Sequence, residues 1–332
     1  MTDPLLSVRN LTMDIPVGGG TLHAVRGIDF DLNRGETLCI VGESGSGKSL
    51  TSLALMGLLG KGIQRSADRM TFDGIELTKA SKRQMRALRG GRMSMIFQEP
   101  MTSLNPAYTI GDQLAEALLL HRTVTREQAR ARAVELLEKV GITAAESRLS
   151  QYPHQLSGGL RQRVMIAMAL MCEPELIIAD EPTTALDVTI QAQILRLLYD
   201  LGREMNMAMI LITHDLGVVA RVADKVAVMY AGELVETGPV AEIFNTPSHP
   251  YTRGLLRCIP LPGKTERGKS LGTIPGIVPS LVGSVEGCVF RTRCPHATME
   301  CRGAIPQHHD GEHAFRCIFA DGKRHSDKEL TA

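Results

Sequence analysis

The chain has 332 residues, of which 43% are hydrophobic, and 37 Lys and Arg residues nearly balance 36 Asp and Glu residues. The net charge of +1, the absence of Trp and an aromatic content of only 4% argue against a nucleic-acid-binding protein, which usually has a basic excess or stacking aromatics. The length predicts roughly two domains, with enough apolar residues to bury a sizeable core.

Neither a leader sequence nor a membrane span is expected. The first residues lack a basic stretch followed by a long apolar one, so no signal peptide is predicted. The longest wholly apolar run, Val164–Cys172, is much shorter than the ~18 residues of a membrane span. Seven cysteines, an odd number, favour a reducing cytoplasm over a disulfide framework. We therefore expect a soluble chain that needs partner subunits if it acts at a membrane.

Residues 1–245 alternate short apolar runs with helical patterns, which predicts an α/β fold. The apolar run before Asp180 is typical of a strand whose two faces are both covered by helices. Strands are expected at Glu36–Val41, Met93–Phe97, Glu175–Ala179, Ala208–Thr213 and Val226–Tyr230. Helices are expected at Lys48–Leu59, Arg126–Val140, Gly159–Leu170 and Val188–Asn206.

The composition changes after about residue 246. Pro, Gly, Cys and His accumulate there, and helical periodicity fades apart from a short signal at Tyr251–Leu256. We therefore predict a domain boundary at this point, with one domain at residues 1–245 and a small irregular domain at residues 246–332.

A phosphate-binding loop is predicted between the first expected strand and helix. The residues from Gly42 to Ser49, GESGSGKS, match G-x-x-x-x-G-K-[ST] in full. Glycines allow backbone N–H groups to curl around an anion, and the helix N-terminus adds favourable partial charge. We expect Lys48 to reach the β- and γ-phosphates and the Ser49 hydroxyl to bind Mg²⁺. The predicted nucleotide-binding residues are Gly42, Ser44, Gly45, Ser46, Gly47, Lys48, Ser49 and Leu50.

Two acidic residues follow the apolar strand at Glu175–Ala179. The strand should place Asp180 at the carboxyl edge of the sheet, beside the phosphate loop, where a carboxylate can hold Mg²⁺. Glu181 is then positioned to polarise a water molecule in line with the γ-phosphate. This pair predicts a hydrolytic site and not a binding site alone.

A second candidate anion site lies at Ser157-Gly158-Gly159, which enters an Arg- and Gln-rich helix that includes Gln162. Backbone N–H groups at a helix N-terminus can bind a phosphate there too. Because one nucleotide needs only one such cradle, the second is predicted to serve the ATP of another subunit.

Over about residues 5–245 the sequence resembles the ATP-binding-cassette (ABC) family. The shared features, in family order, are the phosphate loop, Gln98, Ser157, Asp180-Glu181, Thr184-Ala-Leu-Asp187 and His214. The resemblance implies an ATPase with a RecA-like core, a β-rich edge and a helical subdomain at about residues 100–170.

The resemblance also implies roles for individual residues. Gln98 would contact Mg²⁺ and the attacking water, His214 would bond to the γ-phosphate, and these two would join Glu181 as the catalytic residues. Asp187 would lie at a dimer interface. The signature residues Ser157, Gly158, Gly159 and Gln162 would bind the ATP of the opposite subunit. Many family members stack an aromatic residue on adenine, but Met13–His23 contains none, so Ile15 or His23 is expected to pack there.

Three further motifs resemble the ATPases of di- and oligopeptide importers and extend the resemblance to about residue 320. They are Gln98–Pro106, His249–Thr252 with Leu255 and Leu256, and Ile274–Pro279. The implied function is the ATP-hydrolysing motor of a peptide importer, with importers of nickel, glutathione or opines as alternatives. A DNA-repair ATPase of the same family is a rival, but the interval from Ser49 to Ser157 is short and has no sustained heptad pattern.

The importer interpretation implies several partners. They are a second ABC ATPase, identical or a sister chain, two membrane permease subunits and an extracytoplasmic solute-binding protein, with no nucleic acid. The chain would then be a peripheral protein on the cytoplasmic face of the inner membrane, using ATP and Mg²⁺.

Four of the cysteines, Cys288, Cys294, Cys301 and Cys317, lie in the C-terminal segment. They could be buried thiols that pack as small apolar side chains. A zinc site is an alternative, although zinc ligands usually come in closely spaced pairs. A Cys-Pro step is familiar from iron–sulfur ligation, and the resemblance to peptide importers implies a [4Fe-4S] cluster. We therefore expect a structural [4Fe-4S] cluster, with Zn²⁺ as the alternative.

Overall fold

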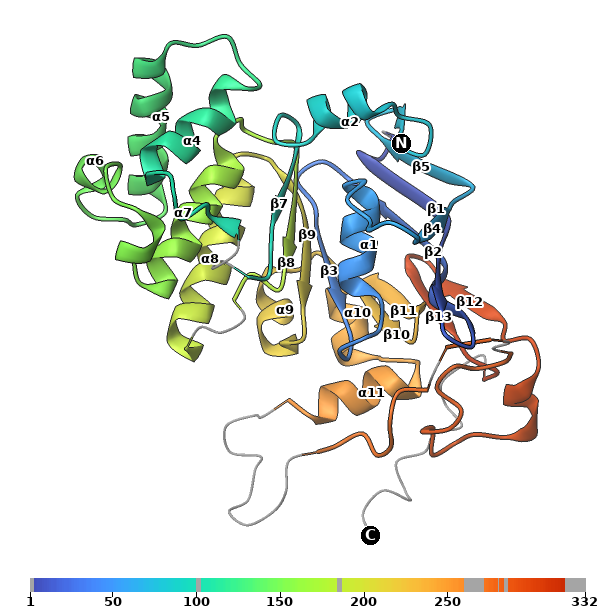
Figure 1. The fold of residues 1–332 in the computed structure, drawn as a ribbon. Helices are drawn as coiled ribbons and strands as arrows, with labels where there is room; N and C mark the ends of the chain where they lie inside the picture. The colour runs from blue at the N-terminus through green and yellow to red at the C-terminus, as the bar shows by residue number, and fades with distance from the viewer. Residues whose placement is uncertain are drawn as a thin grey trace.

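The computed structural model describes residues 3–99, 103–183, 187–259, 272–279, 281–283 and 286–319. Figure 1 shows a central sheet with helices on both sides, a smaller sheet at one flank and a cluster of helices at the other. The C-terminal region, by which we mean the described residues 272–319, lies below the smaller sheet in this view. The predicted α/β class is confirmed.

The main sheet has the strand order β12-β13-β11-β10-β3-β9-β8-β7. Its central strands pair in parallel, from β10 through β3, β9 and β8 to β7. All of β3, β8 and β9 is buried, as expected for strands covered on both faces. The five predicted strands correspond to β3 (Thr37–Val41), β7 (Met93–Ile96), β8 (Leu176–Asp180), β9 (Ala208–Thr213) and β10 (Lys225–Tyr230).

The helices around this sheet overlap the predicted ones, with one clear difference. The helix after the phosphate loop ends at Leu55, four residues earlier than predicted, because Gly57 adopts a left-handed conformation (φ 62°). The N–H groups of Gly57 and Leu58 donate back to Ala54 and Leu53, which closes the helix end. The helices that contact the sheet include α1 (Lys48–Leu55), α7 (Gly158–Leu170), α8 (Val188–Glu204) and α9 (Leu216–Val222).

A second sheet has the order β2-β1-β5-β6, with β4 also paired to β1. The resemblance implied a β-rich edge, but the sequence pattern predicted no individual strand in this part of the chain. The long pairing of β1 with β2 shifts register after Val8, after Leu11 and after Met13. Each shift breaks the strict two-residue alternation by which a strand is recognised in sequence. The strands are β1 (Leu6–Val17), β2 (Gly20–Leu32), β4 (Gln64–Ser66), β5 (Arg69–Phe72) and β6 (Ile75–Glu76).

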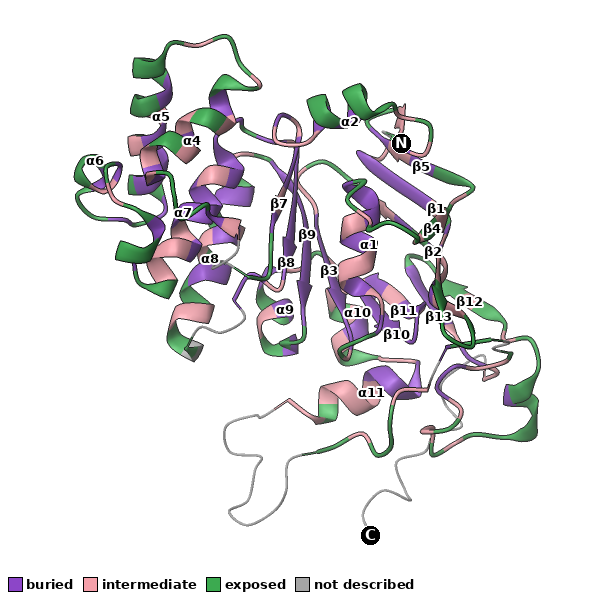
Figure 2. Cartoon of the chain, in the orientation of Figure 1, coloured by how far each residue is buried: buried purple, intermediate pink, exposed green. Residues whose placement is uncertain are grey.

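The helical part of the molecule lies between β7 and β8 in sequence, at the left of Figure 1. The helix at Arg126–Lys139 begins in a capping box, in which Thr125 and Gln128 exchange side-chain and backbone hydrogen bonds. One face of each helix is buried, as Figure 2 shows. The elements are α4 (Ile110–Leu119), α5 (Arg126–Lys139), α6 (Ala145–Arg148) and the 3₁₀ turn η1 (Pro153–Gln155), whereas α2 (Lys82–Leu88) precedes β7.

The C-terminal region attaches to both sheets. The strand β13 pairs antiparallel with β11, so it continues the main sheet. Residues 281–283 bond to β2, where the N–H of His23 donates to Leu281 O (3.0 Å) and that of Gly283 to Thr21 O (3.0 Å). The domain boundary near residue 246 stays a prediction. The elements that follow β10 are β11 (Glu233–Pro239), α10 (Val240–Asn245), α11 (Pro250–Arg257), η2 (Met299–Arg302), β12 (Gln307–Asp310) and β13 (His313–Arg316).

Across the described segments, no helix combines the length and the apolar character that a membrane crossing requires.

Candidate nucleotide-binding site

The predicted phosphate loop curls between the end of β3 and the start of α1. Its glycines are required by the close approach of the backbone to the core. A β-carbon at Gly42 (φ 156°) would lie 2.0 Å from Met229 O, and one at Gly47 (φ 104°) would lie 2.7 Å from Ala24 O. The loop ends at the N-terminus of α1, where backbone N–H groups that have no partner within the helix favour an anion.

Lys48 places a buried ammonium group on this loop. Its Nζ donates to Gly42 O (2.8 Å) and Glu43 O (2.9 Å). Burial lowers the Lys48 pKa, and the nearby carboxylates of Glu181, Asp180 and Glu43 partly oppose this effect. The loop thus holds a cation that a phosphate group could share.

The Ser49 hydroxyl and the Asp180 carboxylate are adjacent. Ser49 Oγ donates to Asp180 Oδ1 (2.9 Å), and Ser52 Oγ lies 3.4 Å from Oδ2 of the same carboxylate. Burial raises the Asp180 pKa, and the neighbouring charge of Glu181 adds to this effect. Hydroxyl and carboxylate oxygens are hard ligands of the kind that Mg²⁺ takes.

A buried hydroxyl in the loop supports binding of a phosphate. Ser46 Oγ is buried and has no hydrogen-bond partner among the residues that the structure describes. Such a group costs free energy unless a ligand satisfies it. An ATP phosphate at the loop would supply an acceptor for this hydroxyl, so the loop and the Ser49–Asp180 pair fit ATP with Mg²⁺.

The three predicted catalytic side chains meet at the carboxyl edge of the main sheet. Gln98 Nε2 donates to Glu181 Oε2 (3.3 Å), and His214 Nδ1 lies 3.6 Å from the same oxygen. They follow three different parallel strands, β7, β8 and β9. Glu181 has a positive φ of 43°, an uncommon conformation for a residue with a side chain, and its N–H donates to Ile212 O.

The predicted signature residues lie apart from this cluster. Ser157 caps α7 by accepting from the Leu160 N–H (3.4 Å), and both Ser157 and Gly158 are exposed. Gln162 is buried, and its Nε2 has no hydrogen-bond partner within the described residues. In those residues no hydrogen bond or ion pair joins Ser157, Gly158 or Gly159 to the phosphate loop.

The other residues that were predicted for the nucleotide site make their contacts elsewhere in the structure. Asp187 is exposed and caps α8, accepting from the Ile190 N–H (3.0 Å). Residues 184–186 of the same motif lie outside the described residues. His23 and Ile15 are the residues that were expected to pack on adenine. His23 Nδ1 is 2.7 Å from Asp14 Oδ1, and Ile15 pairs with Leu22 across β1 and β2.

Sequence reasoning missed two residues that contact the phosphate loop. The Arg293 guanidinium pairs with the Glu43 carboxylate (2.9 Å), and the Glu43 N–H donates to the Tyr251 hydroxyl (3.0 Å). The partners are 250 and 208 residues apart along the chain. The only signal in the sequence was the position of these two residues. Tyr251 lies in His249–Thr252 and Arg293 lies in the cysteine-bearing segment, and neither segment had an assigned role.

The predicted iron–sulfur cluster and its zinc alternative are wrong. Cys288, Cys294, Cys301 and Cys317 are all described, and no group of three or more His, Cys, Asp or Glu side chains in the described residues is arranged to hold a metal ion. Burial raises the pKa of Cys288 to about 11 and that of Cys294 to about 12. Cys301 and Cys317 are buried, and the other two pack against the main core. They therefore act as small apolar side chains.

Comparison with known proteins identifies the family of the chain. The ABC transporter family matches residues 25–184, and the family described as the oligopeptide/dipeptide transporter C-terminal region matches residues 235–301. The chain is 50% identical over 322 residues to the dipeptide transport ATP-binding protein DppD of Bacillus subtilis (strain 168), covering 96% of each chain. It is 50% identical over 302 residues to the oligopeptide transport ATP-binding protein OppD of Salmonella typhimurium (strain LT2), covering 91% of this chain and 89% of that one.

Among solved structures, the fold is similar to a dimeric ATP-binding cassette in a post-hydrolysis state bound to ADP and Pi. The TM-score is 0.64 at 27% sequence identity, with 71% of this chain and 98% of that chain covered. The chain therefore belongs to the ABC transporter family of ATP-binding proteins, and it has the C-terminal region that characterises oligopeptide and dipeptide transporters.

Proposed function

We propose that this chain is the ATP-hydrolysing motor subunit of an importer for dipeptides or oligopeptides. The observation that carries the proposal is the meeting of Gln98 and His214 on Glu181, beside Lys48 and Asp180. The names of relatives that are 50% identical over most of the chain support the peptide class of the solute.

The proposed reaction is attack of water on the γ-phosphorus of ATP, which breaks the bond from that phosphorus to the β–γ bridging oxygen and releases ADP and phosphate. The loop N–H groups, the Ser46 hydroxyl and the Lys48 ammonium bind the phosphates. Ser49, Asp180 and Gln98 would hold Mg²⁺, which neutralises phosphate charge when it is bound. Glu181 orients the attacking water and accepts its proton, while His214 donates a hydrogen bond to the γ-phosphate.

We assign Ser157, Gly158, Gly159 and Gln162 to the ATP held by a second ATPase chain. Ser157 and Gly158 are exposed at the start of α7, where a nucleotide of a second chain can reach them, and Nε2 of the buried Gln162 has no hydrogen-bond partner among the described residues. A similar cassette of known structure is a dimer, which supports a two-chain site with Asp187 at its interface.

An ATPase of an ABC importer works with membrane permease subunits, and this chain would bind them as a peripheral subunit. We further propose that it lies on the cytoplasmic face of the inner membrane and that an extracytoplasmic solute-binding protein delivers the peptide. The names of its peptide-transport relatives are consistent with both statements.

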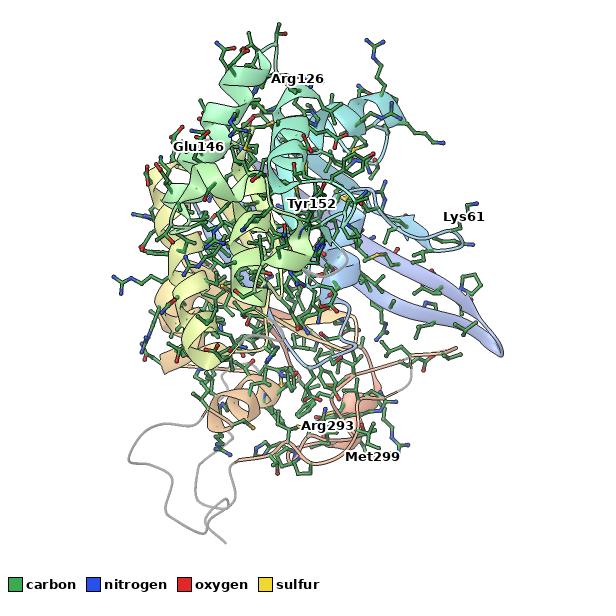
Figure 3. All side chains as sticks on the ribbon, turned by 60° about the vertical axis from the view of Figure 1, so that its left-hand side comes forward. Lys61, Arg126, Glu146, Tyr152, Arg293 and Met299 are labelled. Atoms are coloured by element: carbon green, nitrogen blue, oxygen red, sulfur yellow. The ribbon has the colours of Figure 1, made fainter. Side chains whose placement is uncertain are left out.

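The test is ATP-dependent uptake of a labelled dipeptide by the complete transporter in proteoliposomes. Uptake should occur with the native chain and with Glu146→Gln, a change at an exposed carboxylate labelled in Figure 3, and should be absent with Glu181→Gln. Nickel, glutathione and an opine are assayed in parallel. Uptake of one of these without uptake of any dipeptide or oligopeptide would contradict the peptide assignment.

A further inference from the structure

The phosphate loop contains a negative charge where an anion is to bind. Glu43 directly follows Gly42, and its carboxylate is close enough to Lys48 to raise the pKa of that ammonium. Two negative groups at such short range repel one another strongly when water is partly excluded. An unpaired Glu43 would therefore oppose the phosphates that Lys48 and the loop N–H groups attract.

Arg293, from the C-terminal region, neutralises this carboxylate. Its Nη1 is 3.0 Å from Oε1 and 2.9 Å from Oε2 of Glu43. The Arg293 side chain is only 4% exposed and that of Glu43 is 30% exposed, so the pair is better shielded from water than a surface ion pair. Figure 3 labels Arg293 within the C-terminal region.

The position of Arg293 is fixed by the residues around it. Its Nε donates to Pro275 O (2.9 Å) and its Nη2 to Ile274 O (3.0 Å), both in the motif Ile274–Pro279. Gly276 leaves room for the side chain, because a β-carbon there would lie 3.1 Å from Arg293 Cγ. The guanidinium also lies over the ring of Tyr230, 5.6 Å from its centre.

A second contact from the C-terminal half holds the backbone of the same loop residue. The Tyr251 hydroxyl accepts a hydrogen bond from the Glu43 N–H (3.0 Å). Tyr251 is fully buried, and its ring centre is 4.6 Å from that of Tyr230 and 5.3 Å from that of Phe290. The segments around Tyr251 and Arg293 therefore meet at Glu43, and the segment around Ile274 holds Arg293 in place.

We propose that Arg293 is a positioning residue for ATP binding, which cancels the charge of Glu43 and so allows the phosphate loop to accept an anion. The C-terminal region then completes the nucleotide site of its own chain. This inference rests on the proposed function, because it takes the loop to be the site of the ATP phosphates. Among the described residues, no hydrogen bond or ion pair joins Arg293 to Lys48, Glu181 or His214.

The test measures the Kd for ATP and the kcat and KM of hydrolysis at low salt. Arg293→Gln should weaken ATP binding about 5- to 20-fold, a modest part of what a charge-assisted contact can contribute. The kcat at saturating ATP should stay within about twofold of native, because the catalytic residues are untouched. The loss should shrink as salt is added, since screening weakens the repulsion from Glu43.

The deciding variant is Arg293→Gln combined with Glu43→Gln. Neutral Glu43→Gln needs no counter-charge, so the double variant should bind ATP within about threefold of native protein, much better than Arg293→Gln alone. Arg293→Lys, which keeps the charge, should bind ATP better than Arg293→Gln. The control is Arg291→Gln, whose side chain bonds to the carbonyls of Glu286 and Cys288 within the same region, and it should bind ATP normally.

Two results would overturn the inference. Native ATP affinity in Arg293→Gln would show that Glu43 needs no counter-charge. Equally weak binding in Arg293→Gln and in the double variant would show that Arg293 only supports the structure. Lys48→Ala, measured in parallel, separates this inference from the proposed function: if that variant binds ATP normally, the assignment of the loop fails and the inference fails with it. If Lys48→Ala loses ATP and Arg293→Gln does not, the inference alone fails.

Discussion

The phosphate loop with α1 and the C-terminal region are held together in different ways. In the first, bonds link near neighbours, such as Lys48 Nζ to Gly42 O and the Thr51 N–H to Gly47 O. In the second, side chains reach across the molecule, as when His313 Nε2 contacts Glu236 Oε1 (2.8 Å) on β11. Local bonds depend on a short run of sequence, whereas distant ones depend on the whole fold. The loop should therefore keep its backbone conformation when the C-terminal region loosens, even where its affinity for ATP depends on the distant contact of Glu43 with Arg293.

The largest expected effect follows from removing the loop's cation. Lys48→Ala should weaken ATP binding by about 10- to 100-fold, because the phosphates lose their main counter-charge. The Kd for ATP with Mg²⁺, measured by calorimetry, checks this. Lys61→Ala is the matched control, since Lys61 is exposed, as its label in Figure 3 shows, and lies outside the motif. Equal affinity in the two variants would remove Lys48 from the site.

An experiment in which two inactive variants are mixed tests whether the site needs residues of a second chain. Ser157→Arg and Lys48→Ala should each be inactive alone. If the chains pair with one another at random, an equal mixture should regain about one quarter of native activity, because half the dimers then have one intact composite site. ATP hydrolysis by the mixture is the measurement. Native hydrolysis by Ser157→Arg alone would rule out the role of α7 in a partner's site.

Loss of one buried aromatic ring should lower the stability of the C-terminal region and leave that of the central strands unchanged. Phe290 is 2% exposed and packs on Tyr230 and Tyr251, so Phe290→Ala should destabilise the C-terminal region by about 3 kcal/mol. Hydrogen exchange should quicken in residues 272–319 and stay slow in β3 and β9. Met299→Ala, at a residue that is 72% exposed, is the control. Uniformly faster exchange would mean that the two regions unfold as one unit.

The smallest expected effect is a pH dependence within the C-terminal region. The hydrogen bond to Glu236 raises the His313 pKa above 6.5, although burial opposes the shift; Glu242 and Asp310 are the other carboxylates that raise it. The stability from this pair is therefore complete below pH 6.5 and is lost as the pH rises through the raised pKa. Denaturant unfolding between pH 5 and pH 9 measures it, and His313→Gln should lack this decline. The same decline in His313→Gln would assign it to other groups.

The sequence predicts those parts of the molecule that depend on short motifs, and it does not predict contacts between distant segments. The loop and the strand ends at Gln98, Asp180 and His214 follow from motifs a few residues long, and parallel strands bring their ends to one edge. The pairing of Arg293 with Glu43 spans 250 residues, so no local pattern indicates it. The strands β1 and β2 were missed because bulges disrupt their alternation.

The error over the cysteines has a related physical cause. The sequence predicted that the four thiols converge on one metal centre, and in the structure Cys301 and Cys317 are close enough to raise the pKa of Cys288. Whether such thiols bind a metal or pack as apolar groups depends on the surroundings that the fold supplies. Burial raises the pKa of Cys288, Cys294 and Cys317, and the sequence spacing does not contain that information.

The central claim is that Glu181 activates the water that attacks ATP, and Glu181→Gln tests it most directly. Steady-state hydrolysis and the Kd for ATP with Mg²⁺ are measured on the same preparation, with Glu146→Gln as control. We predict that turnover falls by about 10²- to 10⁴-fold, because general base catalysis is lost, while ATP affinity stays within about twofold of native. Turnover at the native rate with Glu181→Gln would contradict the account.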